Sequence, residues 1–275
     1  MSRAWVPISI IVIVSLCQCE RVEYFPDNPI TDATTRVLAH KGGGGSFGEG
    51  NTLEACVYGL ERLDGIEVDL QKSEDNVLWL GHASDVPGCG AFPKSCFAGL
   101  TSSTIVQIDS CLGKTINFTK LETVFDYASK HHPDKYLSLD VKAWSPCEFN
   151  DINITREMNQ LAAEIILLTS KYGLENRVMV ESETGDFLYY VKTHSDFIET
   201  YLTTLGDFEL GAARALDAGF SGISYEFRAK ENLLKEQVDL LHRKGLKIQV
   251  WTIYDSQAFE EAKSLGVDFI QTDDI

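Results

Sequence analysis

Residues 36–82 read RVLAHKGGGGSFGEGNTLEACVYGLERLDGIEVDLQKSEDNVLWLGH, and this stretch decides the fold. Two of its short apolar runs are typical of buried strands, and they end at His40 and at His82. Between them lies a third apolar run, Gly65–Leu70, which carries Glu67 and Asp69. Because side chains two apart on a strand point to the same face, these two carboxylates are expected to project together.

Two carboxylates buried side by side require a compensating positive charge, since like charges in an apolar strand are costly. A hard divalent cation is the simplest compensation, because Mg²⁺ and Ca²⁺ prefer oxygen ligands. The sequence therefore predicts one divalent cation, Mg²⁺ or Ca²⁺, at Glu67 and Asp69. Histidines at positions 40 and 82 near such an ion suggest acid–base chemistry on a bound substrate.

Beyond this stretch, short apolar runs alternate with amphipathic helical patterns. Eight principal strands are expected, near residues 37, 66, 137, 178, 199, 221, 247 and 268. Strands that alternate with helices form parallel βαβ units, and eight of them predict a TIM (β/α)8 barrel. An open doubly wound sheet is the alternative. No helix is predicted after the strand near 268, so the last helix of the barrel is apparently missing.

The first residues have the layout of a signal peptide. Arg3 is followed by the apolar run Pro7–Leu16, which is short for a membrane span, and then by Cys17-Gln18-Cys19. We expect a signal peptide over 1–19, an N-terminal arm over 20–35 and one barrel domain over 36–275. The protein is then secreted or held in the secretory lumen, with an extracellular location favoured. An uncleaved anchor and a lipidation signal at Cys17 are the alternatives.

Cysteines and sequons support the secretory route. Cys89 and Cys96 flank a short loop and are predicted to pair, with Cys111–Cys147 as a second pair. Cys56 lies on an apolar helix face and is expected to be a buried thiol. Two sequons predict glycosylation, at Asn117 and Asn153.

The charge balance limits the partners. The formal net charge is −17, which argues against nucleic acid and against anionic membranes. A small-molecule substrate and a monomeric protein are expected. Membrane contact, if any, is confined to the long loop 83–119, where Phe92, Phe97 and Leu100 could form an exposed apolar rim.

Four pieces in fixed order resemble the glycerophosphodiester phosphodiesterase family of the PLC-like phosphodiesterase TIM-barrel superfamily. They are HKG at 40–42, NTLEA at 51–55, EVD at 67–69 and GH at 81–82. Later pieces are also similar, namely VWT at 250–252, GVD at 266–268 and TDD at 272–274. The resemblance covers about residues 36–274 and is weak over 83–135.

The resemblance implies an activity, metal-dependent hydrolysis of glycerophosphodiesters to glycerol 3-phosphate and an alcohol. It also implies roles for eight residues: Glu67, Asp69 and Asp140 as metal ligands, His40 and His82 as the acid and the base in either order, and Lys41, Lys142 and Trp251 at the phosphate or substrate.

Three positions depart from the family pattern. Lys41 stands for the usual arginine, Gly50 for the usual glutamate, and Asp140 for the more common glutamate. Asp140 and the cysteine-bearing loop also resemble sphingomyelinase D-like phospholipases, so phospholipase D-like action on lysolipids or sphingomyelin is one alternative. A catalytically inactive barrel that binds phosphoesters is the other, and Lys41 and Gly50 favour it.

Overall fold

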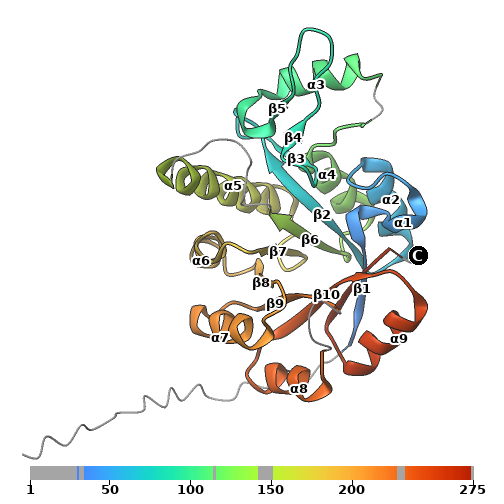
Figure 1. The fold of residues 1–275 in the computed structure, drawn as a ribbon, viewed down its shortest axis with the longest axis vertical. Helices are drawn as coiled ribbons and strands as arrows, with labels where there is room; N and C mark the ends of the chain where they lie inside the picture. Colours follow the sequence, from blue (N-terminus) through green and yellow to red (C-terminus); the bar gives the residue numbers. More distant parts are fainter. Residues whose placement is uncertain (1–29, 31–33, 114–115, 142–150, 228–232, 274–275) are drawn as a thin grey trace, which may run out of the picture.

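A computed structural model describes residues 30, 34–113, 116–141, 151–227 and 233–273. Within them, eight parallel strands follow the order β1-β11-β10-β9-β8-β7-β6-β2, and β1 pairs with β2 to close a barrel (Figure 1). The predicted TIM barrel is therefore confirmed over the open sheet. The barrel strands are β1 (Arg36–Ala39), β2 (Gly65–Lys72), β6 (Tyr136–Val141), β7 (Val178–Ser182), β8 (Glu199–Thr204), β9 (Gly222–Glu226), β10 (Lys247–Ile253) and β11 (Phe269–Thr272).

Helices connect the barrel strands and pack on the outside of the barrel (Figure 1). Their apolar faces and the outward-facing strand residues form the main hydrophobic core, because each amphipathic helix buries one stripe against the sheet. The connecting helices are α2 (Leu53–Arg62), α4 (Leu121–His131), α5 (Asp151–Tyr172), α6 (Gly185–His194), α7 (Phe208–Ala218), α8 (Lys235–Arg243) and α9 (Ser256–Leu265).

The strand after β2 runs back towards the barrel rim. β3 (Leu78–Leu80) pairs antiparallel with β2, with Leu80 opposite Leu70. The next residue, Gly81, donates its backbone N–H to the carbonyl of Asp69 at 2.9 Å. The hairpin therefore returns His82 to the level of Asp69, although β2 continues beyond it.

Residues 83–113 build a small subdomain at one end of the barrel, where the sequence predicted an irregular loop (Figure 1). Its elements are β4 (Asp85–Val86), β5 (Ser95–Cys96), the 3-10 helix η2 (Phe97–Gly99) and the helix α3 (Ser102–Cys111). Thr101 caps α3 by accepting a hydrogen bond from the backbone N–H of Thr104. The subdomain has its own core, made of Trp79, Val86, Phe97, Ile105 and Ile108.

The predicted disulfide pairing is wrong. Cys89 is bonded to Cys111, with 6.0 Å between their Cα atoms. The reason is that α3, which the sequence analysis missed, brings its last residue back to the loop after β4. Cys96 also forms a disulfide, and Cys147 lies outside the described residues. The Cys111–Cys147 pairing is excluded because Cys111 is already bonded.

The prediction for Cys56 is confirmed, since it is a free thiol that is fully buried on α2. Burial, with Glu67 and Glu54 nearby, raises the pKa of this thiol well above its usual value. The thiol is therefore neutral at physiological pH and acts as a small apolar side chain.

Several predictions concern residues outside the described part of the chain: the signal peptide over 1–19, most of the arm over 20–35, and Lys142. At Asn117, the side-chain amide donates a hydrogen bond to Glu54 at 2.8 Å, and Asn153 falls in the first turn of α5. Glycosylation of both asparagines stays a prediction. Among the described residues, no helix has the length and apolar character needed to cross a membrane.

Candidate active site

Three carboxylates meet at the carboxyl ends of β2 and β6. The parallel register places Asp69 beside Asp140, and Glu67 lies two residues earlier on the same face as Asp69. One oxygen from each of Glu67, Asp69 and Asp140 lies within 4.8 Å of the others. Glu67 is 1% exposed and Asp69 is 2% exposed. The structure therefore brings together the three residues that the sequence proposed as metal ligands.

The electrostatics of this triad favour a cation. Burial raises the pKa of Glu67 well above its usual value, and the nearby carboxylates of Asp69, Glu181 and Asp140 raise it further. The backbone N–H of Lys41 donates to Glu67 Oε2 at 2.9 Å and offsets part of this effect. Three clustered carboxylate oxygens are the donor set that Mg²⁺ or Ca²⁺ prefers, so these residues fit such an ion.

His40 lies directly beside the triad. It follows the last residue of β1 and begins the 3-10 turn η1 (His40–Gly42). Its Nδ1 is 2.8 Å from Oδ1 of Asp273, and its Nε2 is 3.9 Å from Oε2 of Glu67. Because an ionised carboxylate only accepts hydrogen bonds, Asp273 keeps the proton on Nδ1 and turns Nε2 towards the triad.

Asn51 holds Asp69 from the loop before α2. Its side-chain Nδ2 donates to Asp69 Oδ2 at 2.8 Å, and its Oδ1 accepts the backbone N–H of Asp69 at 3.0 Å. Asn51 has a φ of 59°, a left-handed conformation that asparagine tolerates better than most residues. The sequence analysis used Asn51 as part of a motif but assigned no role to it.

Two of the departures from the family pattern touch each other. A Cβ atom at Gly50 would lie 2.4 Å from Cβ of Lys41, which no side chain could occupy without a shift. The backbones are joined at the same point, because Asn51 donates its N–H to the carbonyl of Lys41 at 2.8 Å. Because glycine at 50 has no side chain, the backbone at residues 50–51 can lie against Lys41. The φ of Lys41 is 53°.

The second histidine, His82, is exposed and borders a hollow of about 370 Å³ between the rim and the subdomain. Lys41 and Asn51 line the same hollow. The sequence-predicted residues His40, Lys41, His82 and the triad are therefore assembled in one region.

Trp251 is half-buried near the end of β10. In the part of the chain that the structure describes, no group accepts a hydrogen bond from its buried indole Nε1. A buried N–H donor ordinarily has a hydrogen-bond acceptor, and an oxygen atom of a bound substrate could fill this role.

A buried carboxylate below the triad was not predicted. Glu181 on β7 lies beside Asp140 in the sheet register and is 2% exposed. It accepts hydrogen bonds from Ser138 at 3.0 Å, from Gln271 at 2.6 Å and from Ser224. The only signal in the sequence was a single glutamate in the apolar run Val178–Ser182.

The expected apolar rim on the 83–119 segment is not formed by the residues proposed for it. Phe97 belongs to the core of the subdomain, and Phe92 and Leu100 pack against that core. Phe97 is buried, and Phe92 and Leu100 are partly buried against a core that includes Ile105 and Ile108 of α3.

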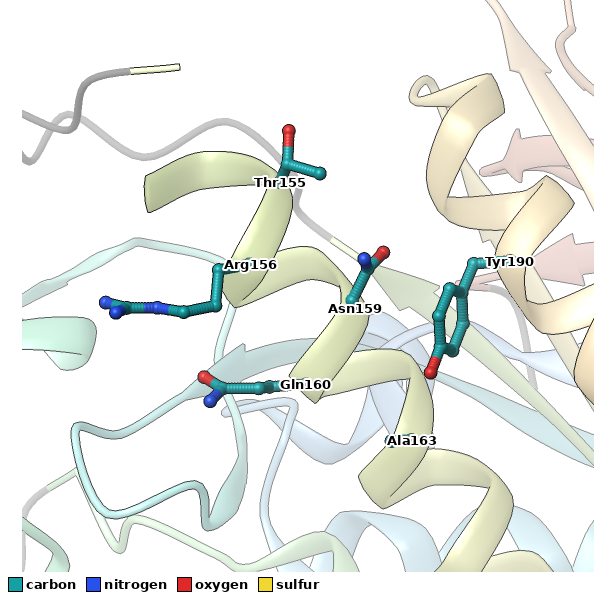
Figure 2. Close-up of a pocket in the computed structure, with 6 residues that line it drawn as sticks. All are labelled: Thr155, Arg156, Asn159, Gln160, Ala163 and Tyr190. Atoms are coloured by element: carbon teal, nitrogen blue, oxygen red, sulfur yellow. The ribbon is translucent and has the colours of Figure 1, made fainter. Parts of the chain in front are cut away.

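A larger hollow, of about 590 Å³, lies outside the barrel between the first turns of α5 and α6 (Figure 2). Figure 2 shows Tyr190 of α6 facing Asn159 of α5, with the side chain of Arg156 directed away from both. None of the predicted catalytic or metal-binding residues lines this hollow. It is an open surface groove outside the candidate active site.

TIM-barrel enzymes carry out their chemistry at the carboxyl ends of the strands, where the triad and His40 lie. Fold and site together place the chain among the TIM-barrel phosphoric diester hydrolases. More narrowly, the chain belongs to the glycerophosphoryl diester phosphodiesterase family, whose model matches residues 40–275. A comparison with curated proteins finds no significant match.

Solved structures of glycerophosphodiester phosphodiesterases share the fold. The enzyme from Parabacteroides distasonis is 21% identical with a TM-score of 0.68, and the match covers 90% of this chain and 94% of that enzyme's chain. The Thermotoga maritima enzyme is 20% identical with a TM-score of 0.65, covering 87% and 95%. A phosphodiesterase from Oleispira antarctica, in complex with the product sn-glycerol-3-phosphate, is 18% identical with a TM-score of 0.69, covering 86% and 92%. At these identities the likeness shows the fold alone.

Proposed function

We propose that this protein hydrolyses glycerophosphodiesters to glycerol 3-phosphate and an alcohol, in a reaction that requires a divalent cation. The observation that carries the proposal is the convergence of Glu67, Asp69 and Asp140 next to a histidine held by Asp273. Family membership and the product complex of the Oleispira antarctica phosphodiesterase support the substrate class.

The triad would hold the cation, which we take to be Mg²⁺ or Ca²⁺. When bound, such an ion supplies positive charge against a non-bridging phosphate oxygen and against the charge that develops during cleavage. Asn51 fixes the orientation of Asp69 through two hydrogen bonds. The backbone N–H of Lys41 does the same for Glu67. These contacts preorganise the ligands before substrate arrives.

The two histidines would move the protons. We assign His40 as the base that deprotonates the attacking hydroxyl, because Asp273 stabilises the charge that His40 then acquires. We assign His82 as the acid that protonates the leaving alcohol, because it borders the hollow next to the site. The attacking hydroxyl belongs to water or to the glycerol of the substrate, and the second case passes through a cyclic phosphate.

Positive and hydrogen-bonding groups would hold the phosphate. Lys41 lines the hollow beside the triad, and the indole N–H of Trp251 is a free donor among the described residues. Lys142 is proposed for the same role on the resemblance to the family. A secreted protein is also proposed, on the layout of residues 1–19 and the disulfide between Cys89 and Cys111.

Release of glycerol 3-phosphate from glycerophosphocholine, followed with a coupled assay, tests this function. Activity should vanish with a chelator, return with Mg²⁺ or Ca²⁺, and fall by at least about 10²-fold in His40→Ala and His82→Ala. His194→Ala, an exposed histidine at the end of α6, is the matched control and should keep full activity.

Two other outcomes would replace the proposal. Turnover of lysophosphatidylcholine alone, with a lysophosphatidate or cyclic product, would assign the phospholipase D-like activity. Binding of glycerophosphocholine without turnover would assign the inactive phosphoester-binding barrel.

A further inference from the structure

The hollow beside His82 combines apolar and acidic surfaces. Its volume is about 370 Å³, within the usual range for small-ligand sites. The apolar part of its lining comes from both the barrel and the subdomain, namely Leu80, Pro87, Phe97, Ile116 and Phe118. Two carboxylates, Glu49 and Asp85, also line the hollow.

The two aromatic rings of the lining are held in place. Phe97 is 2% exposed and packs in the core of the subdomain, and Phe118 packs against that core. Their ring centroids lie 5.5 Å apart with the planes nearly perpendicular. The edge of Phe97 also lies against Gly81, where a Cβ would be 3.5 Å from the ring. The rings are therefore rigid parts of the wall next to His82.

The carboxylate of Asp85 is accessible from the hollow. Its side chain is 35% exposed and forms an ion pair with Lys94 at 2.6 Å. Lys94 is 68% exposed, so this pair contributes little to stability and its lysine is easily displaced. An ammonium group in the hollow would compete with Lys94 for the same carboxylate.

We propose that this hollow binds the alcohol part of the substrate when that alcohol carries a quaternary ammonium, as choline does. The inference rests on the proposed function, in which His82 protonates the leaving oxygen, so the leaving alcohol must lie beside His82. Apolar side chains and carboxylates around one hollow are the surroundings that suit an apolar cation, because the carboxylates attract its charge and the apolar wall contacts its methyl groups. Lys41 also lines this hollow, and its positive charge suits the phosphate of the substrate instead of the ammonium group.

A neutral isostere of the substrate isolates this interaction. Glycerophosphocholine is compared with the glycerophosphodiester of 3,3-dimethylbutanol, in which a carbon atom replaces the nitrogen. We expect kcat/KM to be about 10-fold higher for the choline ester, since the two differ only in charge. The same preference is expected for lysophosphatidylcholine over its dimethylbutyl analogue, if the head group arrives on a lipid.

Variants move this preference in opposite directions. Asp85→Asn and Phe118→Leu should each lower the choline preference at least about threefold, because they remove a carboxylate and an aromatic ring from the lining. Lys94→Met should raise it, because a competing cation is removed. Asp196→Asn, which makes the same charge change on an exposed residue after α6, should leave it unchanged.

The outcomes separate this inference from the function on which it rests. Equal kcat/KM for the two esters in the wild type, or a preference that Asp85→Asn and Phe118→Leu do not alter, overturns the inference while the phosphodiesterase stands. Failure to cleave either ester overturns both.

Discussion

Oδ1 of Asp273 lies 2.8 Å from Nδ1 of His40, although 233 residues separate them in the chain. The contact exists because the first and last strands of the barrel are neighbours, with Ala39 of β1 beside Thr272 of β11. The pairing of β1 with β11 in the closed barrel therefore also brings Asp273 to His40 and orients its ring.

Asp273→Asn should lower kcat by about 10- to 100-fold with little change in KM, because His40 loses the carboxylate that fixes its ring and its proton. Steady-state kinetics with glycerophosphocholine give both constants. Asp196→Asn, remote from the rim, should behave as the wild type. An Asp273→Asn protein with wild-type kcat would show that this contact is only structural.

Asn51→Gly should weaken binding of the divalent cation by about 10- to 100-fold, because Asp69 loses both hydrogen bonds that orient it. Glycine accepts the positive φ of this position, so the backbone is kept. Titration calorimetry with Mg²⁺ or Ca²⁺ measures the affinity. Asn176→Gly, at another positive φ, is the control. Equal affinity for Asn51→Gly and wild type would remove Asn51 from the metal site.

Without a cation, the thermal stability of the protein should fall as pH rises from about 4.5. Burial and the neighbouring carboxylates raise the pKa of Glu67 above its ordinary value of 4.5 in the folded protein, so above that pH the unfolded chain releases a proton that the native state retains. The free energy of unfolding therefore decreases with rising pH until the pH passes the raised pKa. A bound cation replaces the proton, so added Mg²⁺ or Ca²⁺ should raise Tm more at pH 8 than at pH 5.

Glu67→Gln provides the comparison for this pH effect. The neutral amide cannot release a proton, so the Tm of the chelator-treated variant should change less with pH and respond less to added cation. Differential scanning calorimetry at several pH values measures both. The same pH slope in wild type and Glu67→Gln would contradict the raised pKa.

Replacing Cys89 and Cys111 together by serine should lower the free energy of unfolding by about 3 kcal/mol, since the bond closes a loop with a sequence separation of 22. Denaturant titration measures the loss. Peptide mapping without reduction should recover the peptides of Cys89 and Cys111 as one species. Recovery of a Cys89–Cys96 peptide would contradict the structure.

The barrel could be predicted from the sequence because its signals are local. Apolar runs such as Gly65–Leu70 alternate with helical patterns, and the Glu-x-Asp spacing alone places Glu67 and Asp69 on one face. Each of these features depends on residues only a few positions apart.

Contacts between distant segments could not be predicted. The Cys89–Cys111 bond depends on α3, whose weak amphipathic pattern does not distinguish it from a loop in the sequence. The partner of His40 depends on strand order, which brings Asp273 alongside only when the barrel closes. Glu181 is recognisable as part of the site only once β7 lies beside β6. In each case the tertiary structure supplies a neighbour that the local pattern does not contain.

The central claim is that Glu67, Asp69 and Asp140 make phosphodiester cleavage dependent on a cation. Phosphorus NMR of the protein with glycerophosphocholine tests it most directly, first with chelator, then with Mg²⁺ or Ca²⁺, and in parallel with Glu67→Gln. We predict that the resonance of glycerol 3-phosphate, directly or after a cyclic phosphate, grows only in the wild type and only with the cation. Product formation that survives both the chelator and Glu67→Gln, or no product under any condition, would contradict the account.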